Sequence, residues 1–207
     1  KGADVITMLG KEVNIYKLDM YIWEQACKTV AAWEQMGIRD MSISVNISVK
    51  DFFYIDVVEV LKGLVDKYGI SPSKINLEIT ESVFMTDSKT QIARINQLRS
   101  SGFKIEIDDF GSGYSSLNML KELTADILKV DMNFLAITEN EERSRSIVSA
   151  VISLAKKLDM QVITEGVELE EQVEYLAEAG CDMYQGYYFS KPMPLEDFEA
   201  KYVFMNK

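Results

Sequence analysis

Short β-rich segments of alternating polarity, separated by helical segments, constrain the fold of this chain more than any other feature. In INLEIT at 75–80, apolar residues occupy every second position, and Asn, Glu and Thr lie between them. Successive side chains of a strand point to opposite faces, so such a segment has one apolar and one polar face. Six segments have this strand-like composition: 41–48, 75–80, 103–109, 125–131, 161–167 and 183–189.

Helical periodicity fills intervals between these segments. Three stripes stand out: Leu18, Ile22, Ala26, Val30 and Trp33 within 17–36; Ile92, Ile95 and Leu98 within 86–101; and Ile147, Val151, Leu154 and Leu158 within 141–158. The glycines at 37 and 102 suit helix ends. Strand and helix repeating in this order predict parallel strands joined by helical crossovers.

The polar face of the strands has two explanations. Parallel strands covered on both faces usually read as continuous apolar runs, so one explanation is a sheet with a solvated face. The other is a closed barrel with outer helices and a polar interior, which we favour because it leaves no open sheet edge. A (β/α)₈ barrel needs eight strands. We therefore expect an α/β, TIM-like barrel that lacks its first two N-terminal strands in this chain.

Composition narrows the function. The chain has 207 residues, 47% hydrophobic, with a net charge of −11 and no histidine. The charge argues against a nucleic-acid polymer as partner, and the absent histidine excludes Ser-His-Asp and Cys-His catalysis. No apolar run approaches the ~18 residues of a membrane span. Cys27 and Cys181 show neither a disulfide framework nor metal-ligand spacing, which favours a reduced, cytoplasmic setting.

Polar residues gather where the predicted strands end, the edge at which barrels of this type carry their sites. They are Asn46, Glu78, Asp108, Asp109, Lys129, Asp131, Glu165 and Gln185. Clustered carboxylates repel unless protons or cations compensate them, and oxygen ligands suit Mg²⁺ or Mn²⁺. Two such ions about 4 Å apart can hydrolyse a phosphodiester. Each residue alone could instead be an ordinary surface group, Lys129 an ion-pair partner, and the glycine loop after Asp109 a plain turn.

Six motifs in order resemble the EAL-domain family of bacterial cyclic di-GMP phosphodiesterases. They are NIS at 46–48, LEITES at 77–82, IDDFGSGYSSL at 107–117, LKVD at 128–131, TEGVE at 164–168 and QGYYFSKPMP at 185–194. The resemblance runs from about residue 17 to 198. It implies a single TIM-like domain of the EAL type over 1–207 that opens cyclic di-GMP to linear pGpG with two Mg²⁺ or Mn²⁺ ions and is inhibited by Ca²⁺.

The resemblance also implies roles for individual residues. The first metal would be held by Asn46, Glu78 and Asp108, with Asp108 bridging to a second metal held by Asp109 and Glu165. Lys129 would orient or help activate the attacking water, with Glu165 and Gln185 also at the catalytic centre. In addition, Glu81, Gly111 and Gly113 would support the loop at 110–117, and Asp131 and Pro192 would lie near the substrate.

This sequence departs from the family at its own signature, because Glu-Ala-Leu and the arginine after it do not occur. The rival interpretation is therefore a catalytically impaired domain that acts as a cyclic di-GMP receptor or interaction module. A third interpretation is an enolase-type barrel in which a lysine acts as the base. The loop motif IDDFGSGYSSL at 107–117 does not support it. The resemblance further implies a homodimer and an upstream sensory or GGDEF-type domain. The first residue is Lys1 rather than methionine, so we expect a piece of a longer protein.

Overall fold

A computed structural model describes residues 15–80, 83, 88–111, 116–131 and 141–204, which form two compact units divided between Leu128 and Lys129. The first unit holds α2 (Ile15–Gln35), β1 (Ile43–Ile47), α3 (Val49–Tyr54), α4 (Val57–Tyr68), the 3₁₀ turn η1 (Pro72–Lys74), β2 (Ile75–Thr80), α5 (Ser88–Ser100), β3 (Lys104–Phe110) and α6 (Ser116–Glu122). Strand β4 (Ile127–Asp131) crosses the division. The second unit continues with α7 (Glu141–Lys157), β5 (Gln161–Glu165), α8 (Glu170–Glu178), β6 (Met183–Tyr184), α9 (Leu195–Phe198) and the π-helical turn η4 (Glu199–Val203).

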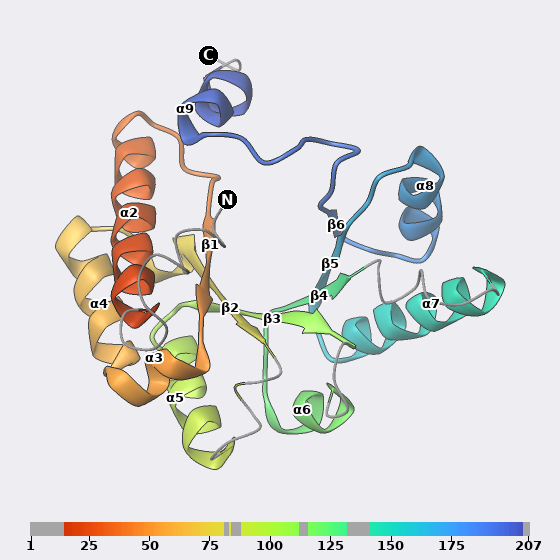
Figure 1. Ribbon diagram of the computed structural model, residues 1–207, viewed down its shortest axis with the longest axis horizontal. Coiled ribbons are helices and arrows are strands. Elements are labelled where there is room, and N and C mark those ends of the chain that lie inside the picture. The colour runs from red at the N-terminus through yellow and green to blue at the C-terminus, as the bar shows by residue number, and fades with distance from the viewer. Residues whose placement is uncertain (1–14, 81–82, 84–87, 112–115, 132–140, 205–207) are drawn as a thin grey trace. The chain divides into compact units, whose positions relative to one another are not determined.

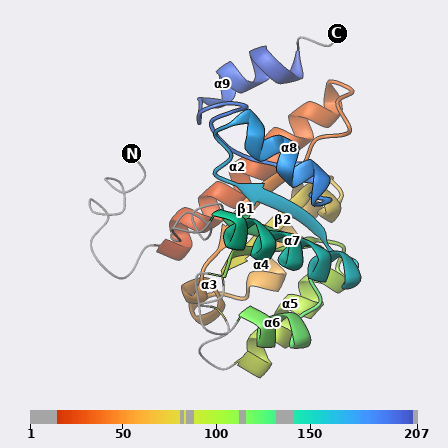
Figure 2. The same ribbon diagram turned by 90° about the vertical axis from the view of Figure 1, so that its right-hand side faces the viewer.

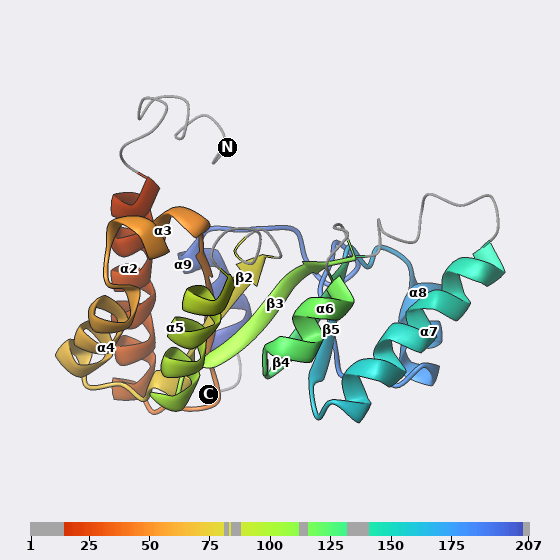
Figure 3. The same ribbon diagram turned by 90° about the horizontal axis from the view of Figure 1, so that it is seen from below.

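The strands of the first unit are parallel and follow one another in chain order. Strand β1 pairs with β2 and β2 with β3, with Val45 opposite Leu77 and Leu77 opposite Ile105. Helix α2 packs against β1, α3 and α4 (Figure 1). Helix α5 lies against α4 and β3 (Figure 3). This order of elements confirms the predicted parallel strands with helical crossovers.

Local signals account for the helix ends in this unit. The Ser48 side chain caps α3 in a reciprocal capping box with Asp51, and the Asp56 carboxylate accepts the N–H of Glu59 at the start of α4. Both arrangements satisfy backbone N–H groups that a helix leaves without an internal partner. Helix α4 ends at Gly69 in the left-handed conformation, where glycine avoids the steric cost of a Cβ.

In the second unit, β5 pairs in parallel with β6, with Ile163 opposite Met183. Helix α7 packs along β5 (Figure 2). The predicted strand at 183–189 is wrong beyond Tyr184, because the N–H groups of Phe189 and Ser190 both reach back to the carbonyl of Gly186 and close a turn. Aromatic residues gave that turn a strand-like composition. The predicted strand at 161–167 likewise stops at Glu165, before Gly166 with φ +73°.

Burial confirms the alternating strands and rejects the solvated face for the central ones. Ile75, Leu77 and Ile79 have no exposed surface. On the opposite face of the central strands, polar side chains are also buried, namely Asn76 and Glu106 in the first unit and Lys129 in the second. Burying a polar side chain costs free energy unless it is hydrogen-bonded. We therefore expect these residues to have a structural or functional role, rather than only to make the protein surface soluble.

The predicted stripe of α2 is largely confirmed, whereas that of α7 faces the core one residue away from the prediction. In α2 the predicted Ala26, Val30 and Trp33 are buried, while Ile22 is 44% exposed and Trp23 and Cys27 are buried beside the stripe. In α7, Val148 and Ile152 are buried and the predicted Ile147 is exposed. A helix turns by about 100° per residue, so a shift of one residue rotates the buried face by that angle.

Among the described residues, no helix combines the length and the apolar character needed to cross a bilayer. Cys27 and Cys181 are buried and free.

Candidate active site

The first unit places three predicted metal ligands near the carboxyl ends of neighbouring strands. Asn46 of β1 lies directly opposite Glu78 of β2. Glu78 is opposite Glu106, so Asp108, two residues further along β3, shares the face of Glu78. Glu78 and Asp108 are half-buried, and the side chain of Asn46 is exposed. The strand register thus brings the three residues to one end of one face.

Asp109 has φ +53°, a left-handed conformation that non-glycine residues rarely adopt, and Gly111 follows at φ +101°. A left-handed residue interrupts the alternation of a strand, so the Asp109 side chain is not confined to the face opposite Asp108. Asp109 is exposed. Of the predicted loop residues, Gly111 is described, whereas Glu81 and Gly113 lie outside the described residues.

The second unit contains a buried ion pair between two predicted catalytic residues. The Nζ atom of Lys129, in β4, lies 2.9 Å from Oε1 of Glu165, the last residue of β5. The two side chains are only 5% and 19% exposed. Burying a charge costs less free energy when an opposite charge is next to it, so each residue compensates the charge of the other. Asp131 ends β4 and is half-buried.

Gln185 belongs to a turn that is joined by backbone hydrogen bonds to residues on both sides of Glu165. The N–H of Gln185 donates to the carbonyl of Thr164 at 2.8 Å, and its own carbonyl accepts the N–H of Val167 at 3.1 Å. Gly186 approaches so closely that a Cβ there would lie 2.0 Å from the carbonyl oxygen of Val167. This contact between two backbones sets the position of Gln185 relative to the end of β5.

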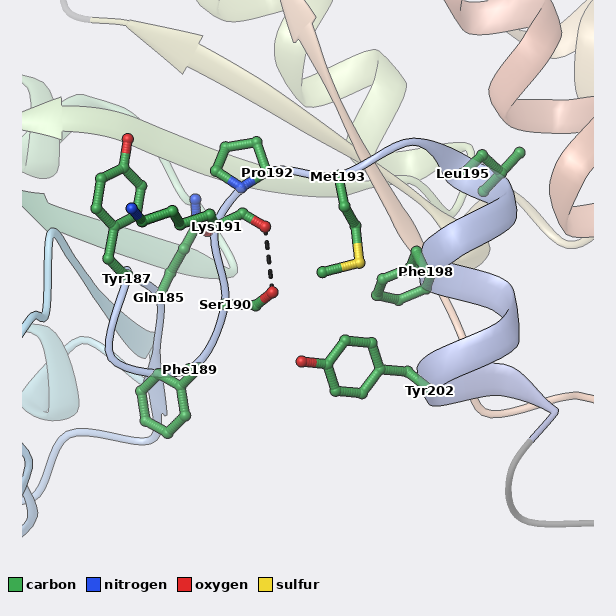
Figure 4. A pocket seen from close by; sticks show the side chains of 11 residues that line it. Gln185, Tyr187, Phe189, Ser190, Lys191, Pro192, Met193, Leu195, Phe198 and Tyr202 are labelled. Atoms are coloured by element: carbon green, nitrogen blue, oxygen red, sulfur yellow. Dashed lines mark hydrogen bonds between the residues drawn. The ribbon is translucent and has the colours of Figure 1, made fainter.

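A cavity of about 700 Å³ adjoins this turn and is lined mainly by apolar and aromatic side chains (Figure 4). Gln185 and Pro192, both predicted from sequence, are exposed and line it with Tyr187, Phe198 and Tyr202. The hydroxyl of Tyr202 points towards Ser190, and hydrogen bonds with Lys201 and then Ser190 lower the pKa of this phenol. Such a cavity offers stacking surfaces with a few polar groups for orientation.

Helix α2 supports the end of β1 through two residues that the sequence reasoning missed. The indole N–H of Trp23 donates to the backbone carbonyl of Asn46 at 2.9 Å. One turn earlier, the carboxyl group of Asp19 lies close enough to that of the fully buried Asp51 to affect its pKa. Burial, followed by the charge of Asp51, raises the pKa of Asp19 to about 7, and burial also raises the pKa of Asp51. The pair therefore shares a proton in the folded protein at mildly acidic pH.

This acid pair predicts a pH-dependent stability. The pKa of Asp19 is raised from 3.8 to about 7 on folding, so its stabilisation is present in full below pH 3.8 and is lost as pH rises through 7. With part of the effect screened by solvent, we expect a loss on the order of 3 kcal/mol. Urea unfolding of Asp19→Asn in EDTA should show the variant gaining stability relative to wild type between pH 5 and 8. Asp56→Asn is the control, and an equal pH trend in both variants would contradict the assignment.

The donor set fits divalent cations. Carboxylate and amide oxygens at adjoining strand ends are the ligands that Mg²⁺ and Mn²⁺ take in proteins. Glu78 and Asp108 are half-buried on the same face, where a divalent cation would offset the repulsion between two carboxylates. In the other unit, Lys129 compensates Glu165 directly.

Comparison with known proteins agrees with this chemistry. The family model described as the EAL domain matches residues 3–192. The bifunctional diguanylate cyclase/cyclic di-GMP phosphodiesterase MucR of Pseudomonas aeruginosa is 36% identical over 186 residues, which are 90% of this chain and 27% of MucR. The chain thus spans about a quarter of the length of this curated relative.

Solved structures share the fold. The PaMucR phosphodiesterase in complex with cyclic di-GMP has a TM-score of 0.84 and 34% identity, over 95% of this chain and 78% of that one. Klebsiella pneumoniae BlrP1, solved with manganese and cyclic di-GMP, has a TM-score of 0.75 and 27% identity, over 90% of this chain and 48% of that one. These neighbours confirm the predicted α/β, TIM-like fold. Because the family model matches nearly the whole sequence and solved EAL domains share its architecture, the chain belongs to the EAL domain family.

Proposed function

We propose that this domain hydrolyses cyclic di-GMP to linear pGpG with two divalent cations, Mg²⁺ or Mn²⁺. The observation that carries the proposal is the buried ion pair between Lys129, in the middle of β4, and Glu165, the last residue of β5, in a member of the EAL family. A lysine and a carboxylate held in this way suit the positioning of a water molecule at a phosphodiester. The related MucR structure was solved with cyclic di-GMP, which supports this choice of substrate.

The proposed roles follow the strand ends. Asn46, Glu78 and Asp108 would hold one cation, and Asp109 and Glu165 the other, with Asp108 shared between them. Bound cations would supply a more acidic water and stabilise charge on the phosphoryl oxygens. Lys129 would orient that water, with Gln185 beside it. Hydrolysis would form a bond from the water oxygen to phosphorus and break the bond from phosphorus to the ribose oxygen, with one proton lost by the water and one gained by the released ribose oxygen.

Substrate contacts are proposed for Asp131 and Pro192. Pro192 lines the aromatic cavity together with Gln185 and Tyr187, and a guanine base could stack on such a surface. Glu81, Gly111 and Gly113 are proposed to support the loop at 110–117.

We also propose that residues 1–207 act as one cytoplasmic EAL domain that forms a homodimer. An upstream sensory or GGDEF-type domain in the full-length protein is part of the same proposal. The support for it is that the MucR relative carries two named activities and is much longer than this chain.

The test is incubation of the full-length protein with cyclic di-GMP in Mg²⁺, Mn²⁺ or Ca²⁺, followed by chromatography. We expect pGpG in Mg²⁺ or Mn²⁺ but not in Ca²⁺, whose longer bonds and looser coordination suit binding rather than catalysis. Tight binding in Ca²⁺ without pGpG in the other two would select the alternative, a catalytically impaired receptor. Neither binding nor turnover would reject both.

A further inference from the structure

Two side chains without exposed surface hold the segment that contains Asn46. Trp23 comes from α2, and Asp51 from the first turn of α3. Both are 0% exposed. Helix α2 packs against both β1 and α3, so the segment between these two elements is held against one helix (Figure 1).

Trp23 acts on Asn46 itself. Its indole N–H donates to the Asn46 backbone carbonyl at 2.9 Å. A buried indole N–H needs an acceptor, and the rest of its ring makes it among the largest fully buried side chains of the chain. The bond fixes the peptide group that follows Asn46 while leaving the Asn46 side chain exposed.

Asp51 binds Ser48, which follows Asn46 by two residues. Its Oδ2 atom accepts the backbone N–H of Ser48 at 2.7 Å and the Ser48 hydroxyl at 2.8 Å. The strand residues on either side of Asn46, Val45 and Ile47, are buried. The backbone of 45–48 is therefore held by core packing before and after Asn46 and by polar contacts at Asn46 and Ser48.

We infer that Trp23 and Asp51 are positioning residues that preset the Asn46 side chain to bind a divalent cation. This inference rests on the proposed function, since it takes Asn46 as a metal ligand. Neither residue is assigned to touch metal or substrate. Their effect is to restrict the backbone, so that less conformational freedom is lost when the Asn46 oxygen binds the ion.

Residues that orient a ligand typically change metal affinity by 10–100-fold when they are replaced. We expect Trp23→Phe, which removes the N–H donor and keeps an aromatic ring, to raise the Kd for Mn²⁺ by about 10-fold. Asp51→Ala should do the same. Because the bound state is unchanged once formed, saturating Mn²⁺ should restore turnover to within about twofold of wild type.

The experiment measures Mn²⁺ binding to the full-length protein by calorimetry and turnover across Mn²⁺ concentrations. Trp33→Phe is the matched control for Trp23, since Trp33 is a buried tryptophan ten residues along the same helix, ~15 Å away. Asp56→Ala matches Asp51→Ala, because Asp56 also accepts a backbone N–H at a helix start. Urea unfolding of all four variants separates metal affinity from stability.

Weaker Mn²⁺ binding in the two test variants, with near wild-type affinity in both controls, supports the inference. Equal affinity in all variants, or equal weakening in tests and controls, overturns it while leaving the proposed function intact. A wild-type protein that binds Mn²⁺ but produces no pGpG overturns only the hydrolytic activity. A wild-type protein that binds no Mn²⁺ overturns both.

Discussion

Lys129→Met is expected to reduce turnover of cyclic di-GMP by about 10³-fold, the range lost when a group that positions or activates the nucleophile is removed. Methionine retains much of the length of lysine but carries no charge. It would leave Glu165 partly buried without its 2.9 Å partner. Chromatography of pGpG at saturating substrate and Mn²⁺ measures the loss, and turnover within tenfold of wild type would contradict the role of Lys129.

Stability must be separated from catalysis in this variant, because loss of one partner of a buried ion pair costs on the order of 3 kcal/mol. The double variant Lys129→Met/Glu165→Gln removes both charges, so it should unfold at higher urea than Lys129→Met alone while remaining inactive. Lys156→Met is the matched surface control. Lys156 pairs with Asp182 at a more exposed position, and its loss should change stability by less than about 1 kcal/mol and leave turnover unchanged.

Gly186→Ala should lower the free energy of unfolding by about 3 kcal/mol or more, the upper range for an overpacked position. The added Cβ would lie 2.0 Å from the carbonyl oxygen, 2.4 Å from the nitrogen and 2.7 Å from the carbonyl carbon of Val167. All three are backbone atoms, so no side-chain rotation relieves the overlap. The two segments must separate, which displaces Gln185 and the residues after Glu165, and turnover should fall as well.

Gly63→Ala provides the matched control for Gly186→Ala. Gly63 lies within α4, and a Cβ there would meet nothing within 4 Å. Alanine in a helix interior is favoured over glycine by about 1 kcal/mol, so this variant should be more stable than wild type. Urea midpoints measure both changes. A Gly186→Ala midpoint close to that of wild type would show that the backbones are not in close contact.

Many of the helices and strands were predictable because their formation depends on residues that are close in the sequence. Strand β2 was predicted at 75–80 and observed there, since its alternation is complete and a proline-containing turn precedes it. Helix α5 was predicted within two residues at its start and one at its end. The error at 183–189 arose because the prediction used local composition, and the aromatic residues there favour a strand. The observed turn depends instead on a backbone contact with a segment further away in the sequence.

The candidate site was only partly predictable. Alternation indicated which residues share a face, but the register that places Asn46 opposite Glu78 is given by the structure alone. Trp23, Asp51 and Gly186 gave no signal of their own, because an apolar stripe, a helix cap and a turn each explain them equally well. Their contacts with Asn46, Ser48 and Val167 connect residues that only the folded chain brings together.

The sequence by itself determined the period of each element, the parallel α/β order, the order of the motifs and hence the family. These properties depend on interactions between residues that are close in the sequence, so residue composition and spacing are enough to predict them. Only the tertiary structure decided which face of α7 is buried, that Lys129 pairs with Glu165, and that helix α2 holds the end of β1. Those outcomes depend on packing between segments that are far apart in the sequence. A helix rotated about its axis by one residue would bury a different set of side chains.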